Sequence, residues 1–203
     1  MKIAVLGAGK IGSVLGTKWA NAGHHVMYGV RDVNSANAQA VMAPEKPKVS
    51  VDSTGAAIAF GEVILFAVPG SSLEVIVSAH SGALANKILV DATNNIGANE
   101  MSGMLIFSSL TPSANVYRAF NALGWENFEQ PQFGDQQADL FFCGPDESSD
   151  LKTMEQLIRE VGLRPVYIGG PEQTPILDNL VKFWFSLAMG RGMGRHLAFK
   201  MLT

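Results

Sequence analysis

The chain has 203 residues and a mass of 21.7 kDa, the size of one domain or of one domain with an appendage. Apolar residues make up 47% of it and charged residues 16%, a composition that excludes disordered and coiled-coil proteins. A formal net charge of -3 and a pI near 5.8 argue against nucleic acids and anionic membranes as main partners. The single cysteine, Cys143, cannot form an internal disulfide, so we expect a reducing, cytoplasmic location.

Neither a membrane segment nor a metal site is visible in the sequence. No apolar run is long enough for a membrane-spanning helix, and the N-terminal run ends at Gly7, too early for a secretory leader. The His and Cys residues never fall at the spacing of zinc ligands. We therefore expect no bound metal, and neither a membrane nor a nucleic acid as partner.

Short apolar strands alternate with amphipathic helices along most of the chain, the pattern of a parallel sheet covered on both faces. The expected strands are residues 2–6, 25–30, 48–51, 62–67, 87–91, 115–119, 139–143 and 164–168. The expected helices are residues 11–21, 35–42, 53–60, 72–82, 147–161 and a long last one from about residue 175. No strand follows that last helix. We expect a domain of residues 1–170 and a helical segment of residues 171–203 that packs on it or on a second subunit.

A glycine-rich loop joins the first expected strand to the first expected helix. It reads Gly7-Ala8-Gly9-Lys10-Ile11-Gly12, a GxGxxG motif inside a βαβ unit. Gly7 permits a tight turn, Gly9 leaves room for a pyrophosphate, and Gly12 lets the helix pack close to the strand. Free N–H groups at the helix start attract the anion, and the helix dipole adds to that attraction. The loop predicts dinucleotide binding, with a plain turn as the alternative.

The end of the second expected strand indicates which dinucleotide binds. The acid that would hold the ribose hydroxyls of NAD is expected at Gly29 or Val30, and neither residue is acidic. Arg31 can therefore meet the 2′-phosphate of NADP with its planar guanidinium group. Asp32 keeps NAD open as an alternative, because it can hold a ribose, or it can cap the next helix and pair with Arg31. The pattern favours NADP.

Several motifs along the chain are found together in one family. They are residues 2–12, 22–26, 31–32, 67–69 (Ala-Val-Pro), 91–94 (Asp-Ala-Thr-Asn), 118–121 (Arg-Ala-Phe-Asn) and 192–202. With them the chain resembles the F420-dependent NADP oxidoreductases, whose dinucleotide-binding domain is similar to the reductase part of the Steap metalloreductases. The resemblance implies an NADP across the carboxyl ends of the strands. It places Ala8, Gly9, Lys10 and Ile11 at the phosphates and Arg31 at the adenosine end. It places Ala67, Val68 and Pro69 beside the nicotinamide.

Two asparagines and a methionine are candidates for the far end of the cofactor and for the second substrate. Asn94 and Asn121 follow expected strands and can hydrogen-bond a carboxamide, with turn formation as the alternative for each. We assign Asn94 to the cofactor and Asn121 to the substrate pocket. Met189, also assigned to that pocket, lies in the last expected helix, where the glycines of residues 190–194 would let the backbone approach a cofactor or another helix.

These observations predict an α/β protein with a Rossmann-type doubly wound parallel sheet and a C-terminal helical appendage. We expect an NADP-dependent oxidoreductase that transfers hydride between NADP(H) and a second small molecule, which the resemblance implies to be coenzyme F420. Hydride transfer to a deazaflavin needs no general acid, so we expect no catalytic acid–base residue. The alternatives are an NADPH-dependent reductase of a carbonyl, a flavin or a metal chelate, and a non-enzymatic redox sensor that binds NADP. A homodimer is expected in each case.

Overall fold

The computed structural model describes residues 1–42, 48–146 and 148–202. The main sheet consists of β1 (Lys2–Leu6), β2 (His25–Val30), β3 (Val49–Ser53), β4 (Val63–Phe66), β5 (Ile88–Asp91) and β6 (Asn115–Arg118). The helices are α1 (Lys10–Asn21), α2 (Ala36–Val41), α3 (Thr54–Phe60), α4 (Leu73–Leu84), α5 (Met104–Leu110), α6 (Trp125–Glu129), α7 (Ser148–Val161) and α8 (Thr174–Phe185). The expected start of α7 at residue 147 lies outside the described residues. No helix within the described ranges is both long and apolar enough to cross a membrane.

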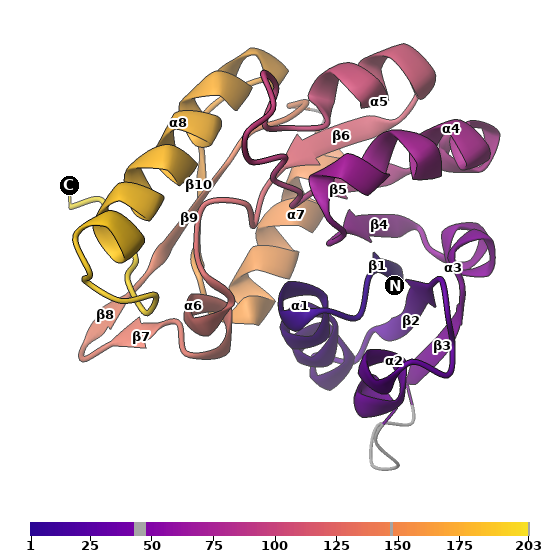
Figure 1. Ribbon diagram of the computed structural model, residues 1–203, viewed down its shortest axis with the longest axis horizontal. Helices are drawn as coiled ribbons and strands as arrows, with labels where there is room; N and C mark the ends of the chain where they lie inside the picture. Colours follow the sequence, from indigo (N-terminus) through magenta and orange to yellow (C-terminus); the bar gives the residue numbers. More distant parts are fainter. Residues whose placement is uncertain (43–47, 147, 203) are drawn as a thin grey trace.

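The six strands form one parallel sheet in the order β3-β2-β1-β4-β5-β6 (Figure 1). The strand order reverses between β1 and β4, because the chain continues outward from β1 on both sides. Ligands of such sheets bind at this reversal, outside the carboxyl ends of the strands. The structure confirms the predicted doubly wound α/β fold and fixes where a ligand site must lie.

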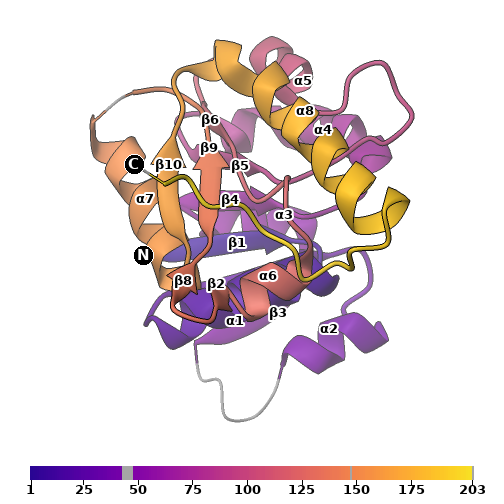
Figure 2. The ribbon, with the colours of Figure 1, turned by 90° about the vertical axis from the view of Figure 1, so that its left-hand side faces the viewer.

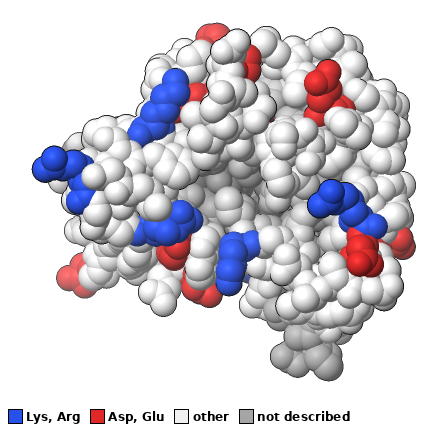
Figure 3. Space-filling view, in the orientation of Figure 1, with Lys and Arg blue, Asp and Glu red and all other residues white. Residues whose placement is uncertain are grey.

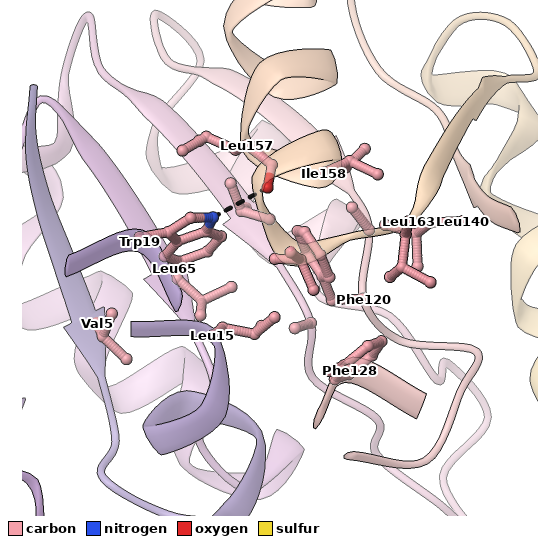
Figure 4. Packing of buried hydrophobic residues seen from close by; sticks show 14 of the residues in the cluster. Val5, Leu15, Trp19, Leu65, Phe120, Phe128, Leu140, Leu157, Ile158 and Leu163 are labelled. Carbon is pink, nitrogen blue, oxygen red and sulfur yellow. Dashed lines mark hydrogen bonds between the residues drawn. The ribbon is translucent and has the colours of Figure 1, made fainter. Parts of the chain in front are cut away.

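Two apolar cores cover the two faces of the sheet, because the strand residues alternate between them. On one face Val5 and Leu65 pack with Leu15 of α1 and Leu157 of α7 (Figure 4). The Nε1–H group of Trp19 on α1 donates to the carbonyl of Leu157 at 3.0 Å, which ties these two helices together. On the other face α3, α4 and α5 contribute Ala57, Val77 and Phe107 among others. The glycine-rich loop of residues 7–12 thus leaves a strand that is anchored on both sides.

The last two predicted strands do not join the main sheet by regular pairing. β9 (Asp139–Phe142) and β10 (Arg164–Tyr167) form a two-stranded parallel sheet of their own, with α7 as the crossover. An isolated antiparallel bridge between Arg118 and Cys143 connects β9 to β6. Helices α5 and α6 and the hairpin of β7 (Gln132–Phe133) and β8 (Gln136–Gln137) were not predicted from the sequence.

The expected long last helix is shorter than its apolar stripe suggested. α8 ends at Phe185 and continues as one π-helical turn, Ser186–Gly190. Gly192 and Gly194 lie beyond it with φ angles of +67° and +85°, so they make turns outside a helix and carry no cost of glycine in a helix. The chain then runs back along β9, where Leu197 and Phe199 pack against the first core (Figure 2).

Asp139 on β9 holds this returning segment in place. Its buried carboxylate accepts hydrogen bonds from Arg164 at 2.7 and 2.6 Å and from the backbone N–H of Met201 at 2.7 Å. Burial opposes ionisation of this group. The hydrogen bonds from Arg164 and Met201 and the charges of Arg164 and Lys200 outweigh burial and hold the pKa of Asp139 below its ordinary value.

Replacing Asp139 with asparagine should lower the free energy of unfolding by about 2 kcal/mol at neutral pH. A carboxyl whose pKa is lowered on folding stabilises the protein above its ordinary pKa, and that contribution is lost as the pH falls through the lowered value. Urea unfolding across pH should therefore show a difference from wild type that is full at neutral pH and shrinks below about pH 4. A difference that does not change with pH would show that the ionised carboxylate of Asp139 is not what stabilises this segment.

The outer face of α8 exposes apolar side chains, which a second copy of the chain could cover in the expected homodimer. Ile176 and Phe183 are 58% and 53% exposed, and both lie on this face beside Lys182. Contact between two copies of this helix stays a prediction, which sedimentation of the protein would test.

Candidate functional site

The three glycines of the loop between β1 and α1 each meet a different packing requirement. Gly7 has a φ of +103°, and a Cβ there would lie 2.5 Å from the carbonyl oxygen of Ala67. A Cβ on Gly12 would lie 2.1 Å from the carbonyl oxygen of Gly7, so only glycine lets α1 start this close to the strand. A Cβ on Gly9 would meet no atom within 4 Å. The loop is therefore closed on the protein side and open to a ligand at Gly9.

A cleft of about 370 Å³ opens at this loop, at the reversal of strand order. Its walls come from the carboxyl ends of β1, β2 and β4 and from the residues that follow them. They are Leu6, Gly7, Ala8, Gly9, Gly29, Val30, Arg31, Asp32, Ser35, Asn37, Thr54, Ala67, Val68, Pro69, Ser72 and Ile76. The space-filling view of this face shows a hollow near its middle with basic side chains around its border (Figure 3).

The start of α1 faces the cleft without a capping side chain. Gly9 is the N-cap residue, and no side chain bonds to the first backbone N–H groups of the helix. The first helical hydrogen bond runs from the N–H of Ser13 to the carbonyl of Gly9 at 2.8 Å. The N–H groups before Ser13 have no partner within the helix, and with the helix dipole they favour an anion in front of Gly9.

One end of the cleft holds Arg31 and Asp32, and the end of β2 beside them carries no acidic side chain. A Cβ on Gly29 would lie 2.7 Å from Leu6 Cδ2 and 2.9 Å from the Cβ of Ala57, so an acidic side chain has no room at this position. Arg31 lines the cleft and makes no hydrogen bond or ion pair with any residue that the structure describes. Asp32 accepts from the N–H of Asn34 at 2.9 Å and does not pair with Arg31. The guanidinium group of Arg31 is thus available to a ligand.

Asp32 does not cap the next helix. The N-cap residue of α2 is Ser35, whose hydroxyl accepts from the N–H of Ala38. Ser35 also lines the cleft, together with Asn37 and Thr54 from the starts of α2 and α3. Sequence reasoning did not assign these three polar residues. The signal for Ser35 and Thr54 was a serine or threonine just before or at a helix start, beside the edge of the sheet.

The other end of the cleft has an apolar wall. Ala67, Val68 and Pro69 follow β4, and the N–H of Ala67 donates to the carbonyl of Leu6, which extends the parallel pairing. Pro69 has a φ of -55° and begins a short 3₁₀ turn, Gly70–Ser72. A proline has no backbone N–H and a fixed φ, so this wall is stiff and offers a flat ligand ring an apolar surface.

Lys10 and Ile11, which were also assigned to the phosphates, do not line this cleft. The Nζ atom of Lys10 lies 5.0 Å from the centre of the Trp125 ring, over the start of α6. Lys10 borders a second hollow between α1 and α2, which adjoins the cleft at Ala8 and Gly9. The side chain of Ile11 packs partly against the first core, so only its backbone is near the loop opening.

Asn94 belongs to a buried network centred on Arg118, which sequence reasoning missed. Arg118 at the end of β6 is fully buried, and its Nη2 donates to Asn94 Oδ1 at 2.9 Å and to Asp178 Oδ1 at 2.8 Å. Its Nη1 lies 3.2 Å from Asp91 Oδ2 and also donates to the carbonyl of Thr93. The network joins the ends of β5 and β6 to α8. Asp91 and Arg118 at the ends of apolar strands were the signal in the sequence.

The two substrate-pocket candidates are not brought together. Asn121 is 4% exposed, and its backbone carbonyl accepts from Asn94 Nδ2 at 2.9 Å, so it lies beside the carboxyl edge of the sheet. Met189 is 58% exposed in the π-helical turn and does not line the cleft. Asn94 is likewise absent from the cleft walls, although its amide lies next to Asn121.

Other reactive side chains lie away from the cleft or are bound within the fold. Burial raises the pKa of the Cys143 thiol, which lies 3.6 Å from Thr174 Oγ1. The imidazole of His24 contacts Glu160 at 2.7 Å and the N-terminal amine at 3.2 Å, and His196 stacks on Phe133. What the cleft offers chemically is therefore helix N–H groups, the guanidinium group of Arg31, the carboxylate of Asp32, an amide, hydroxyls and an apolar wall.

The fold and the glycine loop place the chain in the class of Rossmann-type proteins that includes the NAD- and NADP-dependent oxidoreductases. Within this class, residues 2–95 match the family described as NADP oxidoreductase, coenzyme F420-dependent. This match covers β1 to the end of β5, the cleft included, and confirms the resemblance seen in the sequence.

Curated relatives match about half of the chain. A glycerol-3-phosphate dehydrogenase (NAD(P)+) of Pseudomonas syringae pathovar tomato is 31% identical over 125 residues. The aligned part is 56% of this chain and 37% of that protein. The chain therefore spans well under half the length of these relatives, and what the remainder of those proteins contributes has no counterpart in the alignment.

Solved structures share the whole fold. A protein of Arthrobacter sp. FB24, provisionally called an F420-dependent NADP reductase, has a TM-score of 0.85 and 24% identity, with full coverage of both chains. A Sinorhizobium meliloti protein of unassigned function has a TM-score of 0.71 and 25% identity over 100% of this chain and 96% of its own. A reductive aminase of Aspergillus terreus in complex with NADPH has a TM-score of 0.69 and 19% identity, over 94% of this chain and 62% of its own. These likenesses confirm the Rossmann-type fold.

Proposed function

We propose that this protein binds NADP(H) in the cleft and transfers hydride between its nicotinamide ring and a second small molecule, for which coenzyme F420 is the candidate. The observation that carries the proposal is the cleft itself: a helix start open at Gly9, a guanidinium group at one end and an apolar wall at the other. The helix start suits the bridging phosphates, the guanidinium group suits the 2′-phosphate, and the apolar wall suits the flat nicotinamide ring.

The preference for NADP over NAD is supported by the adenosine end. An NAD site of this kind uses an acid at the end of the second strand, and the space around Gly29 is already filled by Leu6 and Ala57. Arg31 provides a fork of donors that suits a phosphate, and Ser35 and Thr54 add hydroxyl groups along the same wall.

The chain's own residues bind and orient the reactants in this proposal. A bound nicotinamide supplies the hydride or accepts it. The backbone at Gly9 and the start of α1 hold the phosphates, and the wall of Ala67, Val68 and Pro69 fixes one face of the ring and excludes water from it. The opposite face is left to the second substrate. No proton has to be moved if that substrate is a deazaflavin, and no acid–base pair is assigned.

F420 as the second substrate rests on the family match of residues 2–95. Mixing the protein with NADPH and F420, and following the absorbance of the reduced nicotinamide, tests this directly. Oxidation that requires F420 supports the proposal. Oxidation with a carbonyl, a flavin or a metal chelate in its place would assign another acceptor, and tight NADPH binding without oxidation by any of them would indicate a redox sensor.

Replacing Arg31 with alanine should weaken NADP binding by about 30-fold and NAD binding by less than about threefold, because only NADP carries the phosphate that the guanidinium would contact. Titration calorimetry with both nucleotides measures the two ratios. Arg159 on α7, far along the chain from the cleft and paired with Glu155, provides the matched control. Equal losses for NADP and NAD would remove the phosphate role of Arg31.

A further inference from the structure

The side chain of Asn121 is buried without any hydrogen bond. The residue is 4% exposed, and neither Oδ1 nor Nδ2 has a partner among the residues that the structure describes. A buried amide in this state costs free energy, because its hydrogen bonds to water are lost and not replaced. Within the described chain, Asn121 is the one side chain with two such atoms.

The surrounding structure holds Asn121 in this position. Phe120 has a φ of +59°, a left-handed conformation that is unfavourable for a residue with a large side chain. Its ring is fixed by edge-on contacts with Trp19 and Phe128, at centroid distances of 5.9 and 5.7 Å. The backbone carbonyl of Asn121 is tied to Asn94 at 2.9 Å. The amide is therefore held there by the packing of the core.

Two nearby residues, Glu126 and Asn127, also have an unpartnered atom, but each forms hydrogen bonds through its other polar atom. Helix α6, which follows the segment of Asn121, contains these two unpartnered atoms, Glu126 Oε2 and Asn127 Oδ1. Each of these side chains is fixed by its other atom: Glu126 Oε1 accepts from Arg195 at 2.6 Å, and Asn127 Nδ2 donates to the carbonyls of Gly124 and Arg195. Among the residues that the structure describes, only Asn121 has a side-chain amide with both polar atoms buried and without a hydrogen bond.

The place of this amide relates it to the cleft. Asn121 follows β6 at the carboxyl edge of the sheet, where ligands of this fold bind. The segment then leads to α6, which lies beside α1 in both ribbon views, and Trp125 at its start contacts Lys10 of the phosphate loop (Figures 1 and 2). The backbone carbonyl of Asn121 accepts from Asn94, which follows β5, so Asn121 lies beside the ends of two neighbouring strands at this edge.

We infer that the Asn121 side chain binds an amide group, –C(=O)–NH–, of a ligand at the carboxyl edge of the sheet. Its Nδ2 donates to the ligand's carbonyl oxygen while its Oδ1 accepts from the ligand's N–H, a pairing that satisfies both atoms at once. Two ligands carry this group, the carboxamide of nicotinamide and the lactam edge of a flavin-like second substrate. The inference rests on the proposed function.

Replacing Asn121 with leucine, which has a similar shape and no polar atoms, separates this role from a structural one. The melting temperature should rise, because the unpartnered amide is removed, and affinity for the ligand should fall about tenfold or more. Asn127→Leu is the matched control and should lower the melting temperature, since it removes two hydrogen bonds. If Asn121→Leu does not fold, Asn121→Ala replaces it.

Two probes distinguish the sources of the amide group. A loss of NADP affinity in calorimetry, with a smaller loss for the analogue in which an acetyl group keeps the carbonyl oxygen and removes the N–H groups, assigns the nicotinamide. Unchanged NADP affinity with a raised KM for F420 assigns the second substrate. Unchanged values for both, or a lower melting temperature for Asn121→Leu, would overturn the inference. Wild-type protein that fails to bind NADP would instead overturn the proposed function.

Discussion

A valine at position 9 is expected to raise the dissociation constant for NADP by about 100-fold or more while the protein stays folded. Gly9 has φ and ψ angles of -75° and -174°, an extended conformation that valine adopts readily. Its Cβ would meet no atom within 4 Å, so the added methyl groups project into the space that the phosphates need. Calorimetry measures the affinity, and thermal unfolding should show a melting temperature close to that of wild type.

Gly12→Ala is the matched control, with the opposite expected result. One methyl group there would lie 2.1 Å from the carbonyl oxygen of Gly7 and 3.1 Å from Val5 Cγ1, both inside the fold. We expect the free energy of unfolding to fall by about 1–3 kcal/mol. If Gly9→Val kept its NADP affinity, or if both variants lost stability equally, the loop would be a structural turn and the cleft would not be a phosphate site.

Replacing Arg118 with methionine is expected to lower the free energy of unfolding by about 3–5 kcal/mol, the largest stability effect that we predict. The guanidinium group is fully buried between the carboxylates of Asp91 and Asp178, with distances of 3.2 and 2.8 Å. Without it two buried acids face each other unneutralised, and α8 loses its polar attachment to β6. Urea denaturation measures the loss.

A second substitution tests whether charge is the cause. In the double variant Arg118→Met, Asp178→Leu only one acid remains, and that acid, Asp91, keeps its bonds from Thr93 and from the N–H of Gly103. Part of the lost stability should therefore return. If the double variant were less stable than Arg118→Met alone, packing of the long side chain would be the main contribution and not the balance of charge.

The core of the site was predictable because its signals are local. The turn at Gly7, the open position at Gly9 and the close packing at Gly12 all follow from one short motif between a strand and a helix, and the structure shows each of the three. Arg31 and the wall of Ala67 to Pro69 were predictable for a similar reason, since the ends of parallel strands meet at one edge.

The parts that were missed depend on contacts between distant residues. Arg118 and Asp178 are sixty positions apart and meet only because α8 returns across the end of β6. The glycines of residues 190–194 were expected inside the last helix, but Gly192 and Gly194 take positive φ angles where the chain turns back toward β9. The 3.6-residue spacing of apolar residues does not show where the helix ends. That end depends on the returning chain, which is held at Asp139.

By itself the sequence determined the alternation of strands and helices, the parallel sheet and the position of the glycine-rich loop, because periodicity and glycine spacing act over neighbouring residues. The tertiary structure decided that Asn94 turns toward Arg118, that Lys10 turns toward Trp125, and that Asn121 is enclosed without a partner. Those outcomes depend on which side chains compete for each buried hydrogen bond, and that competition exists only once the sheet edge, α6 and α8 have come together.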